Sequence, residues 1–239
     1  MFNKYNLELP DDIYTKLKDS IIFENITKGR LGAVLLYDKC IVRTTTKYTL
    51  PPQLFTDLHE HILSEIYKIS NTNYNFNNAL TEIYNNSYKN MKFHTDQTLD
   101  LEKNTSICIL SLYENKEKPN RKLVIKNKET GIMQEFILEH NTCIIFTLQT
   151  NALHTHKIVR FNNEPNTWLG MTFRVAKKHD FELRLANNDE EKEFFRIRSL
   201  ENKKIEFEYP KIDYTISKSD LLVPITLKPT TLTNYIGSK

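Results

Sequence analysis

The chain has 239 residues, of which 39% are hydrophobic, and a formal net charge of +3. This length fits one sizeable domain with extensions and is too short for two domains of average size. Thirteen Phe and twelve Tyr supply enough apolar surface for a core, which excludes disorder throughout, and the nearly balanced charge neither requires nor excludes a polyanionic partner.

The cysteines and the N-terminal segment indicate where such a protein resides. Cys40, Cys108 and Cys143 are odd in number, widely spaced and set among apolar residues, so they predict reduced side chains, not a disulfide framework or a zinc site. The start, MFNKYNLELPDD, has no basic segment followed by an apolar run, and no stretch of about 18 apolar residues occurs. We expect an intracellular monomer, cytoplasmic or nuclear, without a membrane partner.

The N-terminal part predicts helices around one strand. Residues 11–24 have the pattern of an amphipathic helix, and residues 31–42 that of a strand. After Pro51 and Pro52, apolar residues recur every four positions and predict a second helix to about residue 68. His59 and His61 lie on that helix at a spacing that cannot share one face, so we expect a solvated surface there.

From residue 79 to about 174 the pattern changes to short runs rich in β-branched and aromatic residues. The runs are SICILSLY, KLVIKN, QEFILE, TCIIFTLQ and WLGMTFRVA, separated by turn-like segments. Such spacing indicates an antiparallel sandwich or barrel. We expect an α+β fold with a mainly β core, a double-stranded β-helix (jelly roll) with the N-terminal helices packed on one sheet.

Beyond residue 180 the residue composition and its pattern change again. NNDEEKEFFRIRSL predicts a helix and KKIEFEYP a strand, while the last portion of the final stretch predicts a loosely attached tail. The expected organisation is therefore an N-terminal part (1–78), a jelly-roll core (79–179) and a C-terminal extension of unknown role (180–239).

One tripeptide carries the sharpest chemical signal. In an extended segment, the side chains of residues i and i+2 point to the same side, so His94 and Asp96 can coordinate one ion. A second histidine from another strand would complete a facial triad of two His and one carboxylate, which suits non-haem iron and leaves positions open. His156 is the candidate, because it follows the run TCIIFTLQ where a barrel strand is expected to end.

Iron sites of this kind often take 2-oxoglutarate, whose distal carboxylate needs a cation inside the barrel. Arg174 ends the apolar run that follows the second histidine and is a candidate. A surface arginine at a strand end is the alternative interpretation.

At this point several blocks, in order from about residue 43 to 174, resemble one family. FNNALTEIYNNSYKNMKFHTD, SICILSLY, TNALHTHKI and GMTFR are similar to the blocks of the AlkB-like Fe(II)/2-oxoglutarate-dependent dioxygenases. The resemblance implies Fe(II), 2-oxoglutarate and O2 as cofactors and co-substrates, and makes His156, not His154, the distal ligand. The implied metal-binding and catalytic residues are His94, Asp96 and His156, and the implied co-substrate pocket residues are Arg174, Thr172, Tyr84 and Ser111.

Three positions depart from the family pattern. Trp168 stands where the family usually has a first arginine, Glu82 where an Asn often contacts the co-substrate, and Tyr113 where a Gly is common. Losing one charge-assisted contact weakens binding by about 1.5 to 3 kcal/mol. Either another cation, such as Arg160, substitutes for the missing arginine, or co-substrate binding is altered.

The resemblance implies hydroxylation of a substrate C–H bond, and the region before the barrel commonly forms a substrate lid. That region contains four residues suited to phosphate contact and base stacking, so we expect a nucleic acid partner and oxidative demethylation of its bases. An ordinary solvated surface is an equal alternative for the segment. Two other functions stay open: a hydroxylase of a protein or small molecule, and an inactive binding module. The four residues are Lys39, Arg43, Lys47 and Tyr48.

Overall fold

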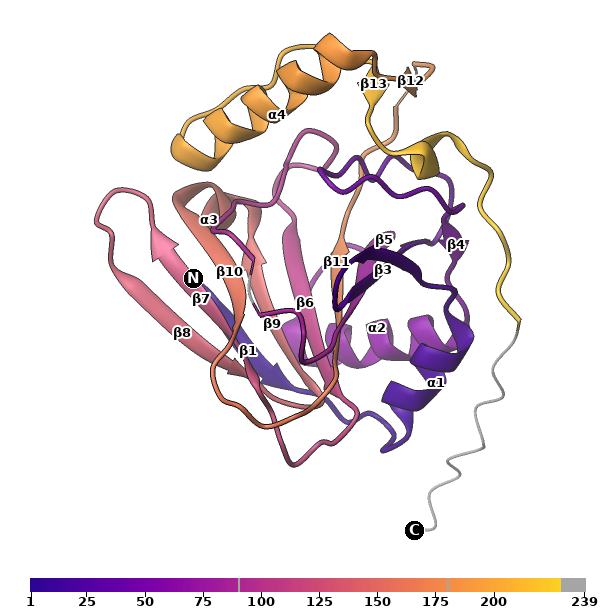
Figure 1. The fold of residues 1–239 in the computed structure, drawn as a ribbon, viewed down its shortest axis with the longest axis vertical. Helices are drawn as coiled ribbons and strands as arrows, with labels where there is room; N and C mark the ends of the chain where they lie inside the picture. The colour runs from indigo at the N-terminus through magenta and orange to yellow at the C-terminus, as the bar shows by residue number, and fades with distance from the viewer. Residues whose placement is uncertain (90, 180, 229–239) are drawn as a thin grey trace.

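Two facing sheets form the centre of the protein in the computed structural model, which describes residues 1–89, 91–179 and 181–228 (Figure 1). The large sheet has eight strands in the order β1-β9-β6-β11-β5-β3-β2 with β4 beside β3, and the small sheet has the order β10-β7-β8. The large sheet comprises β1 (Asn3–Asn6), β2 (Glu24–Thr27), β3 (Arg30–Leu36), β4 (Gln53–Leu54), β5 (Asn78–Tyr84), β6 (Ser106–Tyr113), β9 (Thr142–Thr147) and β11 (Trp168–Arg174). The small sheet comprises β7 (Arg121–Asn127), β8 (Met133–Leu138) and β10 (His154–Arg160).

The order of the strands is that of a double-stranded β-helix. After β5 in the large sheet, the chain crosses to the small sheet, where His94 pairs with His156 of β10. It returns for β6, crosses for β7 and β8, returns for β9, crosses for β10 and ends the core with β11. This alternation confirms the expected mainly β, jelly-roll fold.

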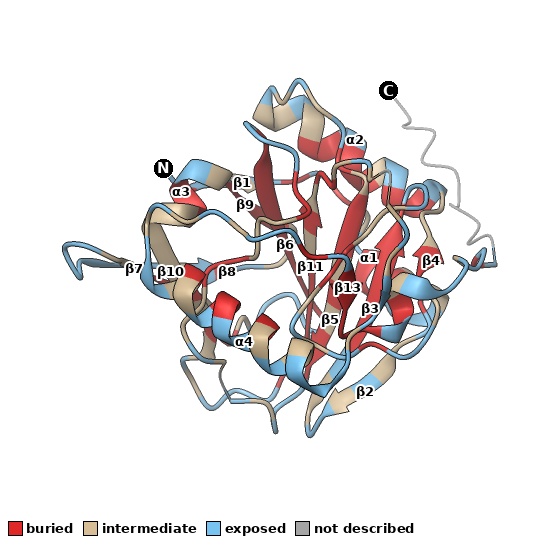
Figure 2. Cartoon of the chain, turned by 90° about the horizontal axis from the view of Figure 1, so that it is seen from above, coloured by how far each residue is buried: buried red, intermediate tan, exposed pale blue. Residues whose placement is uncertain are grey.

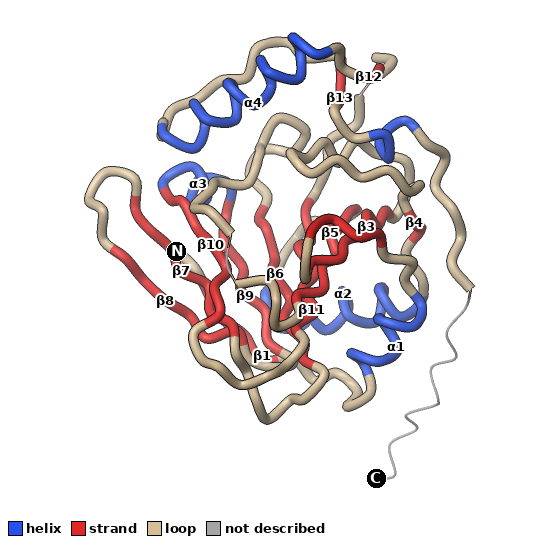
Figure 3. Tube along the Cα trace, in the orientation of Figure 1, coloured by secondary structure: helices blue, strands red, loops and turns tan. Residues whose placement is uncertain are grey.

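Helices lie on the outer face of the large sheet and over one end of the barrel (Figures 1 and 3). The first two, α1 (Ile13–Ser20) and α2 (Asp57–Ser70), bury Leu17 and Ile62 against large-sheet residues such as Leu110. Both were predicted from their apolar spacing. The others are a short α3 (Leu148–Leu153), α4 (Asn188–Lys203) and the 3-10 helix η1 (Lys218–Leu221).

Strand β6 contributes side chains to two hydrophobic cores, one on each face of the large sheet. All eight of its residues are buried, as the red colour of this strand in Figure 2 shows, and alternate side chains point in opposite directions. Cys108 and Leu110 belong to the core beneath the helices, whereas Ile107 and Ile109 belong to the core between the sheets. The inner face of β6 therefore supplies part of the interior of the barrel.

Several predicted elements differ from those observed. The strand predicted at 31–42 ends at Leu36, and the strand predicted at 203–210 does not form, because Phe207 and Tyr209 pack beside α4 instead of pairing with a sheet edge. In the C-terminal extension, two other short strands pair with each other: β12 (Arg184–Leu185) and β13 (Tyr214–Thr215). Residues 229–239 of the predicted tail lie outside the described residues.

The cysteine prediction agrees with the structure, in which Cys40, Cys108 and Cys143 are all free. Within the described residues, no helix combines the length and apolar character needed to cross a membrane.

His59 is buried, with 0% of its surface exposed, so the predicted solvated helix face is wrong for this residue. Its Nδ1 accepts a hydrogen bond from the Thr56 backbone N–H at 3.0 Å and so holds the start of α2. Its ring stacks on Phe55. Burial lowers the pKa of His59 from 6.5 to about 4, because a charged imidazolium loses its hydration there.

This burial predicts an acid-sensitive fold. Between pH 6.5 and about 4 the unfolded chain binds a proton at His59 that the folded chain does not, so the free energy of unfolding falls as the pH falls. The full loss is roughly 3 kcal/mol. We expect His59→Gln to flatten this part of a pH series of urea denaturation curves, whereas His61→Gln, at a half-buried position, leaves it unchanged. Equal slopes for wild type and His59→Gln would contradict the assignment.

Candidate metal site

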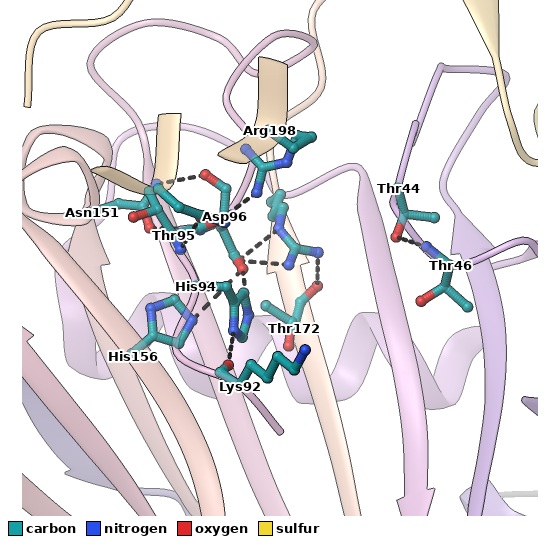
Figure 4. Close-up of polar contacts among 12 residues, drawn as sticks. Thr44, Thr46, Lys92, His94, Thr95, Asp96, Asn151, His156, Thr172 and Arg198 are labelled. Carbon is teal, nitrogen blue, oxygen red and sulfur yellow. Dashed lines mark hydrogen bonds and ion pairs between the residues drawn. The ribbon is translucent and has the colours of Figure 1, made fainter. Parts of the chain in front are cut away.

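His94, Asp96 and His156 converge at one end of the barrel (Figure 4). His94 and His156 exchange both backbone hydrogen bonds, at 3.0 and 2.7 Å, so their side chains project from the same face of the small sheet. Asp96 follows two residues later, and its Oδ1 lies 3.6 Å from Nε2 of each histidine. One ligand atom from each residue lies within 4.8 Å of the other two.

The donor set fits a divalent iron ion. Two imidazoles and one carboxylate on one side of an ion form the facial triad of non-haem Fe(II) sites. His94 Nδ1 lies 3.1 Å from the Lys92 carbonyl oxygen, and an N–H donated there leaves the Nε2 lone pair facing Asp96. Nδ1 of His156 is buried and has no hydrogen-bond partner among the described residues. The predicted trio is therefore brought together in a form that can bind metal.

The electrostatics keep this trio ready for a cation. Burial alone would raise the pKa of the Asp96 carboxyl, but Arg174 and the two histidines outweigh burial and hold that pKa well below its usual value. Burial lowers the pKa of His156, and the neighbouring His94 adds to the effect. At neutral pH Asp96 is thus charged and His156 neutral, which are the protonation states that bind metal.

Arg174 lies beside the metal ligand. Its Nη2 and Nε donate to Asp96 Oδ2 at 2.6 and 3.2 Å, and its Nη1 donates to the Thr172 carbonyl oxygen at 3.3 Å. Arg174 and Thr172 both line the cavity, and their role as co-substrate contacts stays a prediction. Two of the N–H groups of Arg174 are nevertheless directed at Asp96, whose Oδ1 stays turned toward the histidines.

Asn151 holds the backbone of Asp96 and was not among the predicted site residues. Its Oδ1 accepts from the Asp96 N–H at 3.0 Å, and its Nδ2 donates to the Asp96 carbonyl oxygen at 2.8 Å. Asn151 is fully buried in α3, the helix between β9 and β10 that the sequence did not predict. His156 accordingly lies inside β10, not at the end of a strand as expected. The sequence feature that could have indicated the role of Asn151 was its place in the block TNALHTHKI, which also contains His156.

A cavity of about 300 Å³ extends from the trio into the barrel. Tyr84 and Ser111, predicted to line it, are not among its lining residues, because each lies behind a residue that is. Tyr84 donates its hydroxyl proton to Glu82, and Ser111 Oγ accepts from Trp168 Nε1 at 2.9 Å. The two predicted residues therefore support the cavity wall from behind.

Trp168 covers part of the cavity wall. Its indole lies over Gly170, where a Cβ atom would be only 1.9 Å from the ring, and packs against Tyr84 with the ring centroids 4.9 Å apart. The absence of a side chain at Gly170 is what lets the indole lie flat on β11.

Arg30 of β3 contributes a cation to the cavity that Trp168 also lines. Its Nε donates to Glu82 Oε1 at 2.8 Å, and its Nη2 donates to Thr46 Oγ1 at 3.3 Å. The suggested substitute, Arg160, does not line the cavity; it is bonded to carbonyl oxygens of surface loops. Arg30 thus places a cation in the cavity, with Glu82 as its counter-ion.

The lid segment does not present the nucleic-acid surface expected of it. Arg43 and Tyr48 are each 1% exposed, and Arg43 Nε lies 3.2 Å from Asp100 Oδ2 in a fully buried ion pair. Only Lys39 and Lys47 keep exposed side chains. Arg43 and Tyr48 are therefore not exposed for the expected phosphate and stacking contacts, because they hold the segment onto the barrel.

Comparisons with known proteins add little to this geometry. No protein-family model matches the chain, and no curated protein does. Among solved structures, a prolyl-4-hydroxylase of Pseudomonas putida is similar over 73% of this chain and 92% of that chain, at 11% sequence identity and a TM-score of 0.44. The AlkB-like resemblance stays a prediction.

The packing of Trp168 gives a test of the cavity wall. Gly170→Ala forces the indole to move, and overpacking of this kind costs about 1 to 3 kcal/mol of unfolding free energy. In urea denaturation, the double variant Trp168→Leu/Gly170→Ala should lose less stability than the sum of the single variants, because the clash has gone. Additive losses, or a Gly170→Ala variant as stable as wild type, would contradict this packing.

Proposed function

We propose that the protein is an Fe(II)- and 2-oxoglutarate-dependent dioxygenase. The observation that carries the proposal is the convergence of His94, Asp96 and His156 at the mouth of a jelly-roll barrel, beside a cavity. Three ligands on one side of an ion leave its other side free for a chelating co-substrate and O2. When bound, iron and 2-oxoglutarate would supply O2 activation coupled to oxidative decarboxylation, and so the oxidation of a substrate C–H bond.

The chain's own residues prepare the site for that chemistry. His94 and His156 offer Nε2 atoms, and Arg174 engages Asp96 Oδ2 so that Oδ1 faces them. Apolar side chains that line the cavity exclude water from the space next to the trio, which strengthens every charge interaction there. These side chains are Leu80, Met91, Leu101, Ile109 and Ile158.

We propose that Arg30 binds the distal carboxylate of 2-oxoglutarate. In the register of the large sheet, Trp168 pairs with Tyr84 and Tyr84 with Arg30, so Arg30 stands two strands away from the position of the missing arginine. Its guanidinium reaches the cavity, where it can bind a carboxylate with two N–H groups. Because Glu82 competes for those groups, we expect weaker co-substrate binding than an unpaired arginine would give.

One feature favours a substrate other than a nucleic-acid base. Arg43 and Tyr48, which were expected to contact phosphate and bases, are buried. Base demethylation therefore remains an expectation without a matching surface. Hydroxylation of a protein side chain or a small molecule is the second candidate, and this feature supports it.

An anaerobic titration tests the proposed chemistry. Adding 2-oxoglutarate to the Fe(II)-loaded protein should produce the visible metal-to-ligand charge-transfer band of a chelated 2-oxo acid. Fe(II) binding without this band would contradict the dioxygenase and favour the third possibility, an inactive binding module.

The assignment of Arg30 has its own test. Arg30→Met should weaken 2-oxoglutarate binding at least tenfold in the same titration, since a charge-assisted contact of about 1.5 to 3 kcal/mol is lost. Arg160→Met removes an arginine outside the cavity and serves as the matched control. Equal co-substrate affinity in both variants would show that Arg30 is not the anchor.

A further inference from the structure

The C-terminal helix α4 lies across the end of the barrel that holds the metal trio (Figures 1 and 2). Its start is well defined, because Asn187 Oδ1 accepts hydrogen bonds from the N–H groups of Asp189 and Glu190, both at 3.0 Å. Phe194 and Ile197 fix one face of the helix in a small hydrophobic cluster with the segments that follow it. This helix belongs to the part of the chain for which the sequence indicated no role.

The last two turns of α4 bind the backbone of the segment that carries Asp96. Asn202 Oδ1 accepts from the Thr95 N–H at 2.8 Å, and Arg198 Nη2 donates to the Thr95 carbonyl oxygen at 2.5 Å. Glu201 Oε1 accepts from the N–H and the hydroxyl of Thr98, at 3.2 and 3.0 Å. Thr95 lies between the two proposed metal ligands His94 and Asp96, and α4 binds both of its backbone groups.

The residues that make these contacts are themselves held in place. Arg198 and Glu201 form an ion pair and are only 6% and 4% exposed, and the Tyr209 hydroxyl bonds to both. Lys128 Nζ, from the turn after β7, donates to the carbonyl oxygens of Glu201 and Lys204 at 2.9 and 2.8 Å. These bonds satisfy carbonyl groups at the C-terminal end of the helix.

Residues 95–98 need such partners because they belong to no strand. In a sheet, the backbone groups of Thr95 and Asp96 would be satisfied by a neighbouring strand, and buried groups without partners would destabilise the segment. Here side chains replace the missing strand. Asn151 of α3 takes both backbone groups of Asp96, and α4 takes both of Thr95.

We propose that α4 positions the metal site: Asn202 and Arg198 hold Thr95 so that the carboxylate of Asp96 faces His94 and His156. The inference rests on the proposed metal site and adds that metal affinity depends on the C-terminal extension. Asn202 and Arg198 are positioning residues, because they act through the backbone between two ligands. Arg198 also lines the cavity, so the same helix bounds the space for the substrate.

The test is a Co(II) titration of the full-length protein, followed by the visible d–d absorption of the bound ion. Asn202→Ala removes one acceptor and should weaken Co(II) binding about tenfold or more, as loss of outer-shell partners does. Asn202→Asp keeps the acceptor and should restore wild-type affinity. Arg196→Met, an exposed change on the same helix, should bind like wild type.

The outcomes separate this proposal from the metal site itself. If Asp96→Ala binds Co(II) as tightly as wild type, the proposed metal site is wrong. If Asp96→Ala loses binding while Asn202→Ala keeps wild-type affinity and an unchanged d–d spectrum, the metal site stands and the positioning role is refuted. A lower melting temperature for Asn202→Ala at unchanged affinity would likewise refute it, since that pattern marks a purely structural contact.

Discussion

The ion pair between Arg174 and Asp96 is the interaction on which the site depends. A carboxylate that is 7% exposed would lose much of its hydration and take up a proton unless a charge and hydrogen bonds compensated for its burial. Arg174 supplies that compensation at 2.6 Å. Because only one oxygen of Asp96 is taken, the other can face the two histidines.

Arg174 is in place because β11 lies in the middle of the large sheet. This strand is bonded to β6 on one side and β5 on the other, so its register is fixed by two ladders. Alternate side chains of β11 build two different environments. Leu169, Met171 and Phe173 enter the core beneath the helices, while Trp168, Thr172 and Arg174 face the cavity. Stability and site geometry thus come from opposite faces of one strand.

Local patterns were sufficient to predict most of the β core. The runs around Ser106–Tyr113 and Trp168–Arg174 could be identified because strands buried on both faces are continuous in apolar residues. The spacing of His94 and Asp96 indicated a shared ion because neighbours two apart in an extended segment point the same way.

Several of the wrong or missing predictions depend on contacts between residues that are distant in the sequence. Arg43 looked like a surface cation because it lies near Lys39 and Lys47 in the sequence, yet Asp100 and the carbonyl of Ile212 bury it. The predicted strand at 203–210 had the right composition but no sheet edge to join. The role of Arg30 could not be inferred either, since it follows from strand pairing across the large sheet.

A comparison of two neighbouring histidines tests most directly whether His94, Asp96 and His156 together bind one metal ion, as we propose. His154 and His156 lie on the same strand, but only His156 directs Nε2 at Asp96, whereas His154 Nδ1 lies 2.8 Å from the Thr150 carbonyl oxygen. Fe(II) binding measured anaerobically by calorimetry should be lost in His156→Ala and kept in His154→Ala. Retained binding in His156→Ala, or loss in His154→Ala alone, would contradict the account.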